Sequence, residues 1–366
     1  MGTGARMDRE LNTQVFIRSG ACISALGANL DEAWEMLLKN TSGLSLNLGN
    51  WEGRISNLEG NRFNELLDQL LKEIVLNEQN NIANKDTQVI ISTTKANIED
   101  LPANAFAEMT SKVQSVLQLS NEPIVVSNAC ISGIIAINLA ADLIKSGSCN
   151  RVIVIGIDVL SEFVTTGFKA LFALSNSLCK PYDKQRKGIN LGEAGAYVVL
   201  SNIKDAHSYS ARFLSGASSN DANHISGPSR TGEGLYRAIH KSIERAEINS
   251  SAIDFIQAHG TATLYNDEME SIALGRLDLE GSPSNSFKAY IGHTLGAAGV
   301  IETIFSLKCL EEDMLIKSLG YEEHGLGSPM NIITKNRATK LSTILKSGSG
   351  FGGCNAAFII QKIESE

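Results

Sequence analysis

The sequence predicts an α/β protein in which two similar halves pack together as one body. Along the chain, short buried apolar runs typical of strands alternate with stretches whose apolar residues recur at helical spacing. The second half repeats the alternation of the first. No linker, low-complexity tract or run of charge divides the halves, which are expected to meet near residues 202–210.

The composition indicates an ordinary globular protein. The 366 residues are enough for one large domain or two fused halves, and 43% of them are hydrophobic and 20% charged. The net charge of −8 argues against nucleic acid and anionic membranes as partners, although an acidic protein can still dock on a local basic patch. No apolar run reaches membrane-spanning length, so we expect no membrane segment.

The six cysteines are scattered, with neither a CxxC pair nor the Cys/His spacing of a zinc site. They are Cys22, Cys130, Cys149, Cys179, Cys309 and Cys354. A reducing, cytoplasmic location is the simplest expectation. Residues 1–12 are expected to form a leader or disordered start, because a second methionine, Met7, follows a short segment without the pattern of a signal peptide.

The first half opens with a strand at residues 13–24 that runs into a Gly/Ser turn. Asn29 followed by acids marks a helix start, because negative charge is favourable in the first turn, and a helix is expected over residues 33–38. Further helices are predicted from their helical apolar spacing over residues 63–75 and 106–119. Further strands are predicted from buried apolar runs over residues 87–92, 151–157 and 197–200.

The chain is organised around residues 123–147. An apolar run at 124–126 predicts a short strand, and residues 131–144 predict a buried helix that stops at Gly147. The strand that follows at 151–157 makes this a strand–helix–strand unit, which implies a right-handed parallel crossover.

Cys130 lies where this strand turns into the helix. Unpaired backbone N–H groups and the positive end of the helix dipole lie close to such a position, and both stabilise a thiolate, the nucleophilic form of cysteine. A small buried cysteine in a tight turn explains the stretch equally well.

The second half follows the same alternation. Its strands and helices are expected over residues 212–216, 234–246, 253–257, 267–277 and 356–360. Residues 295–310 are nearly all apolar, which predicts a buried helix. The glycine-rich residues 348–353 are not a nucleotide-binding P-loop, because no Lys-Ser/Thr follows and the next element is a strand.

His259 and His293 stand at strand ends beside small residues, and strand ends are where α/β folds place ligands. The neighbouring Gly260 and Gly292 allow the backbone to approach a substrate closely. A lone histidine is more often a packed or surface residue than a catalyst. Two of the six histidines in such settings, together with a strand-end cysteine, favour a catalytic site.

Taken together, these motifs resemble the β-ketoacyl-acyl carrier protein synthases of the condensing-enzyme superfamily, which have the thiolase fold. The resemblance runs from about residue 13 to residue 363. The motifs that carry it are Asn128-Ala129-Cys130, Pro181-Tyr182-Asp183, Gly192-Glu193-Ala194-Gly195, His259-Gly260-Thr261-Ala262-Thr263, Lys288 with Gly292-His293, Gly296-Ala297-Ala298-Gly299 and Gly350-Phe351-Gly352-Gly353. It implies a thiolase-like, layered αβαβα arrangement. The half at residues 13–205 would carry the nucleophile and the half at 206–366 the two histidines.

The resemblance also implies a reaction. Cys130 would take an acyl chain from a carrier-protein thioester, and malonyl carrier protein would then lose its carboxylate and attack the acyl-cysteine, which lengthens the chain by two carbons. The backbone N–H groups of Cys130 and Phe351 would hold the first oxyanion, and His259 and His293 the malonyl oxyanion. No metal or diffusible cofactor is implied, since the phosphopantetheine arrives on the carrier.

Further residues take roles by the same resemblance. Lys288 would be the lysine of the site, and Glu302 a buried carboxylate that needs a partner, for which Lys288 is the candidate. Phe351 would also act as a gate that swings with acylation. The residues expected to contact the substrate are Thr261, Thr263 and Gly352, the two threonines by holding the pantetheine arm.

Simpler explanations remain for some of these residues. Lys288 can be an ordinary surface lysine, and the two threonines can merely form a turn. Asp267 and Glu270 match acids that open the helix after His259, and the helix dipole alone explains acids there at least as well.

His293 indicates the elongating, Cys-His-His type, because chain-initiating synthases of the superfamily carry asparagine there and thiolases use a late cysteine base. Cys354 is the candidate for such a cysteine, but Lys288 and His293 both fit the elongating pattern.

The segment at residues 95–125 is shorter than the same region in typical fatty-acid elongating synthases, and the residues around Cys130 are less rich in threonine and serine. A specialised pathway, such as polyene pigment synthesis, is therefore an alternative to housekeeping fatty acid synthesis.

The partners implied are acyl carrier protein and a second subunit, in a homodimer or a heterodimer paired through the strand next to the nucleophile. A rival interpretation is a non-catalytic subunit that sets chain length in a heterodimer, and the joint presence of Cys130, His259, Lys288 and His293 argues against it. A Cys/His metal protein is disfavoured by the spacings.

Overall fold

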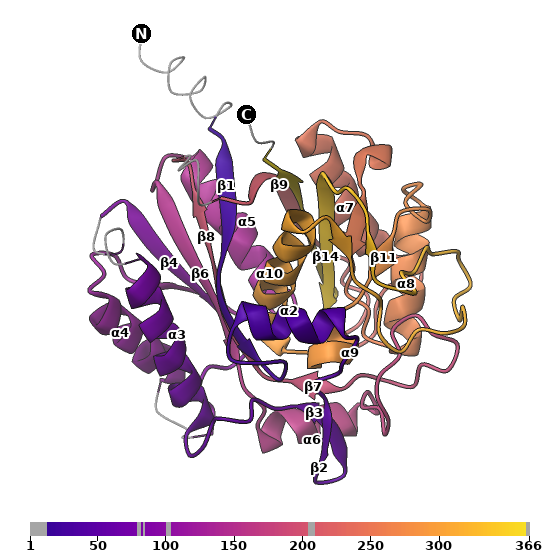
Figure 1. Ribbon diagram of the computed structural model, residues 1–366, viewed down its shortest axis with the longest axis horizontal. Coiled ribbons are helices and arrows are strands. Elements are labelled where there is room, and N and C mark those ends of the chain that lie inside the picture. The colour runs from indigo at the N-terminus through magenta and orange to yellow at the C-terminus, as the bar shows by residue number, and fades with distance from the viewer. Residues whose placement is uncertain (1–12, 79–81, 83–84, 100–103, 204–208, 364–366) are drawn as a thin grey trace.

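A mixed ten-stranded sheet runs through the centre of the structure, a computed structural model that describes residues 13–363 except 79–81, 83–84, 100–103 and 204–208 (Figure 1). Its strands from the first half are β1 (Val15–Ser24), β4 (Thr87–Ser92), β5 (Ile124–Val126), β6 (Arg151–Asp158) and β8 (Ala194–Ser201). Its strands from the second half are β9 (Ala211–Asn220), β10 (Phe255–Gln257), β11 (Ser284–Asn285), β14 (Thr343–Gly350) and β15 (Cys354–Lys362).

The strand order shows that the two halves share one topology. Read outward from the middle of the sheet, the first half runs β1-β8-β6-β4-β5 and the second runs β9-β15-β14-β10-β11, so corresponding strands occupy corresponding places. Strands β1 and β9 pair antiparallel and join the halves. The predicted pair of similar halves is confirmed. The predicted boundary between residues 205 and 206, and the predicted start at residues 1–12, lie outside the described residues.

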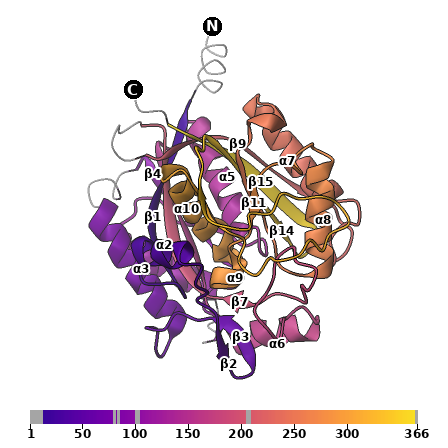
Figure 2. The same cartoon turned by 45° about the vertical axis from the view of Figure 1, so that its right-hand side comes forward.

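The helices complete five layers (Figures 1 and 2). Helices α5 (Ser132–Lys145) and α10 (Ala298–Glu311) lie in the middle and share a core with both halves of the sheet. Helices α3 (Arg62–Glu78) and α4 (Ala105–Leu117) cover the outer face of the first half. Helices α7 (Glu233–Ala246) and α8 (Leu264–Gly275) cover that of the second. The layered αβαβα arrangement is thus as predicted.

Burial on both faces explains why the strands were visible in the sequence. Val152 and Val154 of β6 face the central helices, while Ile153 and Ile155 face α3 and α4, so the strand is apolar over residues 152–157. Strands β5 and β6 both pair parallel with β4, one on each side, which confirms the parallel crossover through α5.

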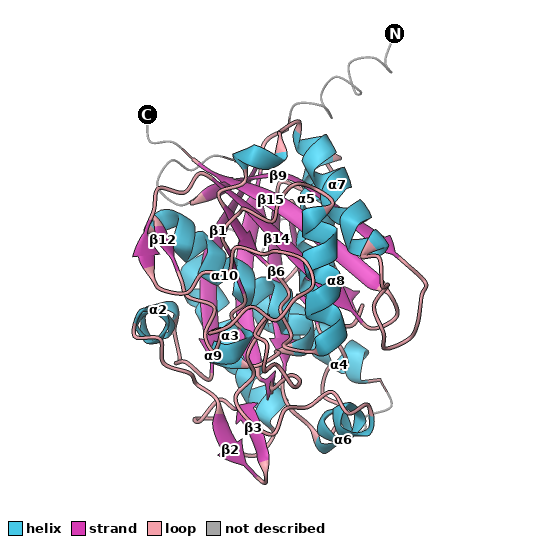
Figure 3. Cartoon of the chain, turned by 90° about the vertical axis from the view of Figure 1, so that its right-hand side faces the viewer, coloured by secondary structure: helices cyan, strands magenta, loops and turns pink. Residues whose placement is uncertain are grey.

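Smaller elements surround this core, and β2, β3 and α6 lie together at one end of the molecule (Figure 3). The smaller strands are β2 (Ser45–Asn47), β3 (Asn50–Gly53), β7 (Leu191–Gly192), β12 (Met314–Leu315) and β13 (Arg337–Ala338). The remaining helices are α2 (Leu30–Leu38), α6 (Glu162–Ala170), α9 (Lys288–Ile291) and the single 3₁₀ turns η1 (Ser250–Ala252) and η2 (Leu295–Ala297). No helix within the described part of the chain has the length and apolar character needed to cross a membrane.

The central helices α5 and α10 touch at their N-terminal ends through two glycines. A Cβ atom on Gly133 would lie 2.9 Å from the Cα of Gly299, and a Cβ atom on Gly299 would lie 2.5 Å from the backbone nitrogen of Ile134. Only glycine permits so close an approach. Because Cys130 directly precedes α5 and His293 directly precedes η2 and α10, this crossing brings the two residues to one place.

Candidate active site

Cys130 lies in the tight connection between β5 and α5 and is 9% exposed. Ala129 has a φ of 45°, in the left-handed region that side chains rarely adopt. Ser132 supports the turn, since its hydroxyl accepts a hydrogen bond from the N–H of Asn128 at 2.8 Å and donates one to the carbonyl of Ala129 at 2.7 Å. The strand-to-helix position predicted for Cys130 is therefore correct.

The glycine-rich turn after β14 closes over the cysteine. A Cβ atom on Gly350 would lie 3.2 Å from the backbone nitrogen of Cys130, and the N–H of Phe351 donates to the Cys130 sulfur. Cys130 and Phe351 thus place their backbone N–H groups beside the same thiol, as the resemblance implied.

Burial determines the state of the thiol. It raises the pKa of Cys130 to about 11, although the positive charge of Lys288 and the N–H of Phe351 act in the opposite direction. The stabilised thiolate expected from the helix N-terminus is therefore outweighed, because the sulfur is removed from water. At neutral pH the group is a thiol, and a nearby base has to accept its proton when it reacts.

The two histidines lie next to this thiol. Their ring centroids are 5.3 Å apart with an interplanar angle of 86°, and the Cys130 sulfur and one ring nitrogen of each histidine lie within 4.8 Å of one another. Burial, with the charge of Lys288, lowers the pKa of His293 to about 3 and that of His259 well below its usual value. Both imidazoles are therefore neutral at pH 7, so each can donate one N–H and accept one proton.

The tautomer of His293 follows from its contacts. Its Nδ1 accepts a hydrogen bond from the N–H of Leu295 at 3.3 Å, so the hydrogen of the neutral ring sits on Nε2. That Nε2 is buried and has no hydrogen-bond partner among the described residues. Because His293 lines the cavity described below, it presents an unused N–H donor to a ligand there.

Lys288 is fully buried and is not the surface lysine that sequence alone left possible. Its ammonium donates to the Glu302 carboxylate at 2.7 Å, as predicted, and to the backbone carbonyl of His259 at 2.6 Å. The other oxygen of Glu302 lies 2.9 Å from the ammonium of Lys346, which is also buried. Lys288 and Lys346 hold the pKa of Glu302 below its usual value despite burial, which keeps it an anion.

Lys346 was missed in the sequence. The signal was present, because a lysine within the otherwise apolar and small-residue run Thr343–Gly350 has to point into a covered layer. The sequence shows residues 348–353 as a glycine-rich stretch, whereas the structure continues strand β14 through Gly350 and turns at residues 351–353.

Asp267 and Glu270 hold the backbone of the histidine turn. Asp267 accepts the N–H of Thr261 at 3.0 Å, and Glu270 accepts the N–H groups of His259 and Gly260 at 2.7 Å each. Burial, with the charge of Asp267, raises the pKa of Glu270 to about 7. Both acids thus support the turn rather than merely favouring the start of α8, and neither contacts the His259 ring.

A cavity of about 520 Å³ opens onto Cys130, His259 and His293. Thr261 and Thr263 line it, with their hydroxyl groups 2.8 Å apart. Gly352 is not part of the lining, since its N–H donates to the carbonyl of Ile225 instead. The wall and rim were not predicted and are strongly apolar, with Phe168, Leu171, Phe172, Ile225, Leu264 and Tyr265.

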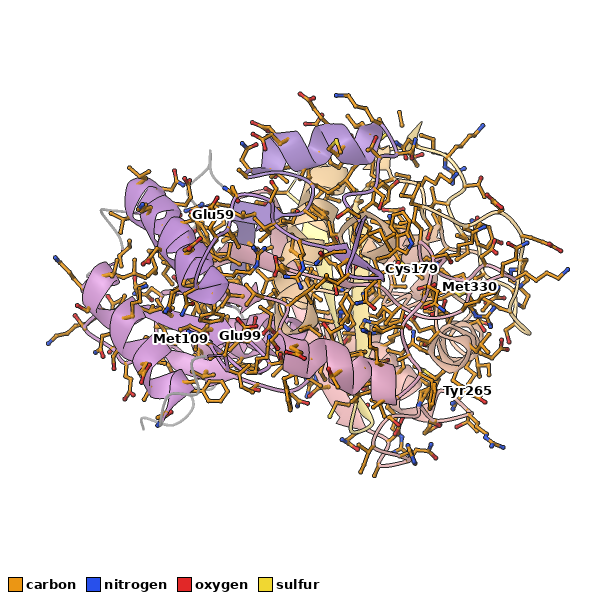
Figure 4. The ribbon with its side chains drawn as sticks, turned by 90° about the horizontal axis from the view of Figure 1, so that it is seen from below. Glu59, Glu99, Met109, Cys179, Tyr265 and Met330 are labelled. Carbon is orange, nitrogen blue, oxygen red and sulfur yellow. The ribbon has the colours of Figure 1, made fainter. Side chains whose placement is uncertain are left out.

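Phe351 lines this cavity together with Cys130. Its ring stacks on that of Phe168, with centroids 5.5 Å apart and planes inclined by 26°. Phe172 and Tyr265, 94% and 76% exposed, lie at the rim, and Tyr265 is seen on the outside of the molecule in Figure 4. The rim is thus apolar, and Cys130, His259 and His293 line the same cavity.

Comparison with known proteins agrees with this geometry. Residues 77–206 match the family described as "Beta-ketoacyl synthase, N-terminal domain", and residues 211–322 match "Beta-ketoacyl synthase, C-terminal domain". The chain is 32% identical over 253 residues to 3-oxoacyl-[acyl-carrier-protein] synthase 2 of Rhizobium meliloti, covering 65% of this chain and 60% of the relative. It is 30% identical over 253 residues to 3-oxoacyl-[acyl-carrier-protein] synthase 1 of Escherichia coli, covering 65% and 61%. The match therefore spans about 60% of the length of these curated relatives.

Solved structures share the fold over nearly the whole chain. The ishigamide ketosynthase/chain length factor superposes with a TM-score of 0.88 at 21% identity, over 96% of this chain and all of the other. The ketosynthase ApeO of Xenorhabdus doucetiae, solved with its chain length factor ApeC, superposes with a TM-score of 0.85 at 25% identity, over 96% and 98%. The two family matches together cover more than half of the chain, and Cys130, His259 and His293 meet in one cavity. The chain belongs to the β-ketoacyl synthase family, with a Cys-His-His site.

Proposed function

We propose that the protein is a 3-oxoacyl-[acyl-carrier-protein] synthase, an acyltransferase that joins malonyl-loaded carrier protein to an acyl group held on Cys130. The observation that supports this most directly is the unpartnered, buried Nε2 of His293 in the cavity that also holds the Cys130 thiol. An N–H donor there has no use in the protein itself, and it suits a thioester oxygen.

The first half-reaction loads the cysteine. The Cys130 sulfur attacks the thioester carbonyl of an acyl carrier protein, and its proton passes to a neutral histidine ring nearby. The backbone N–H groups of Cys130 and Phe351 stabilise the tetrahedral oxyanion. The carbon–sulfur bond to the carrier then breaks, and the carrier sulfur takes the proton from the histidine and leaves as a thiol.

The second half-reaction extends the chain. Malonyl carrier protein places its thioester oxygen against the N–H donors of His259 and His293, and loss of CO₂ leaves the electron pair of the broken carbon–carbon bond as an enolate. The enolate carbon attacks the acyl-cysteine carbonyl, and the Cys130 sulfur leaves as a thiolate that takes up a proton from solvent. The product remains on the carrier.

Other site residues take supporting roles in this proposal. Thr261 and Thr263 contact the pantetheine arm, whose phosphopantetheine belongs to the carrier, and Phe351 opens the way to the thiol. We further propose that the reaction uses neither metal nor diffusible cofactor. The site consists of a cysteine and two histidines, so elemental analysis of the purified active protein is the direct test.

The experiment is mass spectrometry of Cys130. Acyl carrier proteins of different chain length and saturation are added, the acyl mass on the protein is located by peptide mapping, and malonyl carrier protein is then supplied. We expect acylation at Cys130 and a product two carbons longer, with both lost in Cys130→Ala and both retained in Cys354→Ala. The best acyl donor would identify the pathway, housekeeping or specialised. Acylation elsewhere, or none from any donor, would count against the proposal.

A second candidate is a partner-dependent subunit that sets chain length. It is favoured by one finding, that similar structures include ketosynthases solved with chain length factors. We propose a dimer in either case, with β5 at the edge of the described sheet as the pairing strand. Light scattering of the purified chain tests for the homodimer, and acylation that appears only after a related subunit is added would favour the second candidate.

A further inference from the structure

Glu302 is shared between two buried lysines. Its Oε1 accepts from Lys288 at 2.7 Å, and its Oε2 lies 2.9 Å from the Nζ of Lys346. All three side chains are at most 2% exposed. Lys288 also donates to the carbonyl of His259, and Lys346 donates to the carbonyl of Ser347 at 2.7 Å. One carboxylate thus serves two ammonium groups, which come from different elements.

By formal charge the cluster carries one net positive charge, although burial lowers the pKa of Lys346. A pair of Lys288 and Glu302 would be neutral, and Lys346 adds one cation that no second carboxylate neutralises within the cluster. Glu270 and Asp267 are the next buried acids, but their oxygens already accept backbone N–H groups of the histidine turn and of Tyr182. The charged and titratable groups facing the two imidazoles are Lys288, Lys346, Glu302 and Cys130, with Glu270 behind the His259 backbone.

We propose that Lys346 is a positioning residue of this site: it shares Glu302 with Lys288, leaves one uncompensated positive charge behind His259 and His293, and so adds to burial and to Lys288 in keeping both imidazoles neutral N–H donors. This inference rests on the proposed function for its consequence in catalysis, but not for the charge state that it assigns to the histidines.

The sign and the position of this charge suit the reaction. During decarboxylation, negative charge moves from the malonyl carboxylate onto the thioester oxygen that the histidines hold. A fixed cation behind the histidines acts at short range in a medium of low polarity, so it favours the state in which the charge has reached that oxygen. A protonated imidazole would donate as well, but it could not accept the Cys130 proton during loading.

Lys346→Gln tests the charge while keeping a hydrogen-bond donor. Removing a cation makes protonation of the neighbouring imidazoles easier, and a protonated imidazole cannot accept the Cys130 proton. The acid limb of the pH profile for acylation of Cys130 therefore moves to higher pH. If the limb moves by one pH unit, the rate at a fixed pH on the acid side of the profile falls about tenfold. We expect Lys346→Arg, which keeps the charge, to retain the wild-type limb.

Lys145→Gln is the matched control. Lys145 is also largely buried and donates to the carbonyl of Leu214. Lys145 is the last residue of α5, whereas Cys130 lies before its first residue. A helix of 14 residues is about 20 Å long, so Lys145 lies far from the reacting thiol. Its loss should leave the limb unchanged. A Lys346→Gln enzyme that is slower with an unmoved limb would overturn the proposal, because a merely structural lysine predicts that result.

Nitrogen-15 NMR of the histidine rings tests the charge state without any reaction. Neither His259 nor His293 should protonate between pH 8 and pH 5 in the wild type, and at least one should begin to do so in Lys346→Gln or, where that variant does not fold, in Lys346→Met. A wild-type ring that titrates between pH 6 and pH 7, or unchanged rings in a folded variant, would refute the role of Lys346. A wild type that passes this test but decarboxylates no malonyl carrier protein would instead refute the proposed function.

Discussion

At the scale of single residues, burial sets the protonation state of the reacting groups. Cys130, His259 and His293 are each removed from water, and in each case the charged form is the one disfavoured. The site therefore rests as a neutral thiol between neutral imidazoles. Such a site reacts by moving a proton within itself when a thioester arrives, rather than by holding a preformed thiolate.

The first prediction concerns the thiol. With a pKa of about 11, the thiolate fraction of Cys130 rises about tenfold for each pH unit up to that value, so its alkylation by iodoacetamide should still be accelerating at pH 9. Peptide mass spectrometry follows the rate at Cys130 over pH 6 to 10, with Cys354 in the same sample as a partly exposed reference. A rate at Cys130 that levels off near pH 7 would contradict the prediction.

The second prediction concerns His293. Replacing it by alanine removes the unpartnered Nε2 donor, and loss of one oxyanion donor typically costs a factor of 10² to 10³. We expect malonyl carrier protein decarboxylation to fall by about that factor while acylation of Cys130 changes much less, since Cys130 and Phe351 hold the first oxyanion. His240→Ala, on helix α7, is the control and should behave as wild type. Equal losses in both half-reactions would mean that His293 also serves the loading step.

At the scale of elements, the geometry of the site depends on how two helices start. Helices α5 and α10 cross at Gly133 and Gly299, and the residues that precede them, Cys130 and His293, meet as a consequence. Neither glycine was singled out in the sequence for this reason, although Gly299 lay in a motif of the resemblance. A glycine inside a helix is visible in a sequence, but the backbone that it allows to approach is not.

The third prediction tests this crossing. Gly299→Ala would place a Cβ atom 2.5 Å from the backbone nitrogen of Ile134, which cannot move without shifting α5. Overpacking of this kind costs about 1 to 3 kcal/mol of stability, and the shift should also slow acylation of Cys130. Gly167→Ala in α6 is the matched control, because no atom lies within 4 Å of its added Cβ and alanine favours a helix by about 0.5 to 1 kcal/mol. Urea unfolding gives both values, and equal effects of the two substitutions would contradict the prediction.

The elements predicted most accurately from the sequence were those whose apolar residues recur at one clear spacing or form a continuous apolar run. Strand β6 and helix α7 have nearly the predicted bounds, because one is buried on both faces and the other has one apolar stripe. Strand β14 was missed since glycine, serine and lysine obscure its pattern, and Lys346 was missed with it. Small residues there permit close packing against Ile134, and the lysine finds its partner on a helix far away in the sequence. Such a partner is a property of the tertiary fold.

At the scale of the whole molecule, the site is built from both halves. The first half supplies Cys130, and the second supplies His259, His293, Lys288 and Phe351. The sheet is continuous through β1 and β9, and the central helices belong to a core shared by the two halves. The motifs could be placed in order from the sequence, but their meeting at one cavity required the packing of one half against the other.

The last prediction links the charge state of the site to the stability of the whole fold. The folded pKa of His293, about 3, lies below the ordinary value of 6.5, so the unfolded chain binds a proton more readily. Stability from this group is therefore complete above pH 6.5 and is lost as the pH falls toward 3, at up to about 1.4 kcal/mol per pH unit. Glu270 acts in the opposite sense, because its raised pKa of about 7 makes the folded state gain a proton as the pH falls from 7 to 4.5.

The two effects are separated by comparing variants rather than by the wild-type curve alone. His293→Gln keeps a polar side chain of similar size but cannot gain the proton, so its free energy of unfolding should decline less than that of the wild type between pH 6.5 and pH 4. The difference between the two urea-unfolding curves should thus shrink steadily as the pH is lowered, while Glu270 contributes equally to both and cancels. Parallel curves would mean that His293 takes up a proton as readily in the folded protein as in the unfolded chain. They would also remove the basis for treating it as the neutral N–H donor of the reaction.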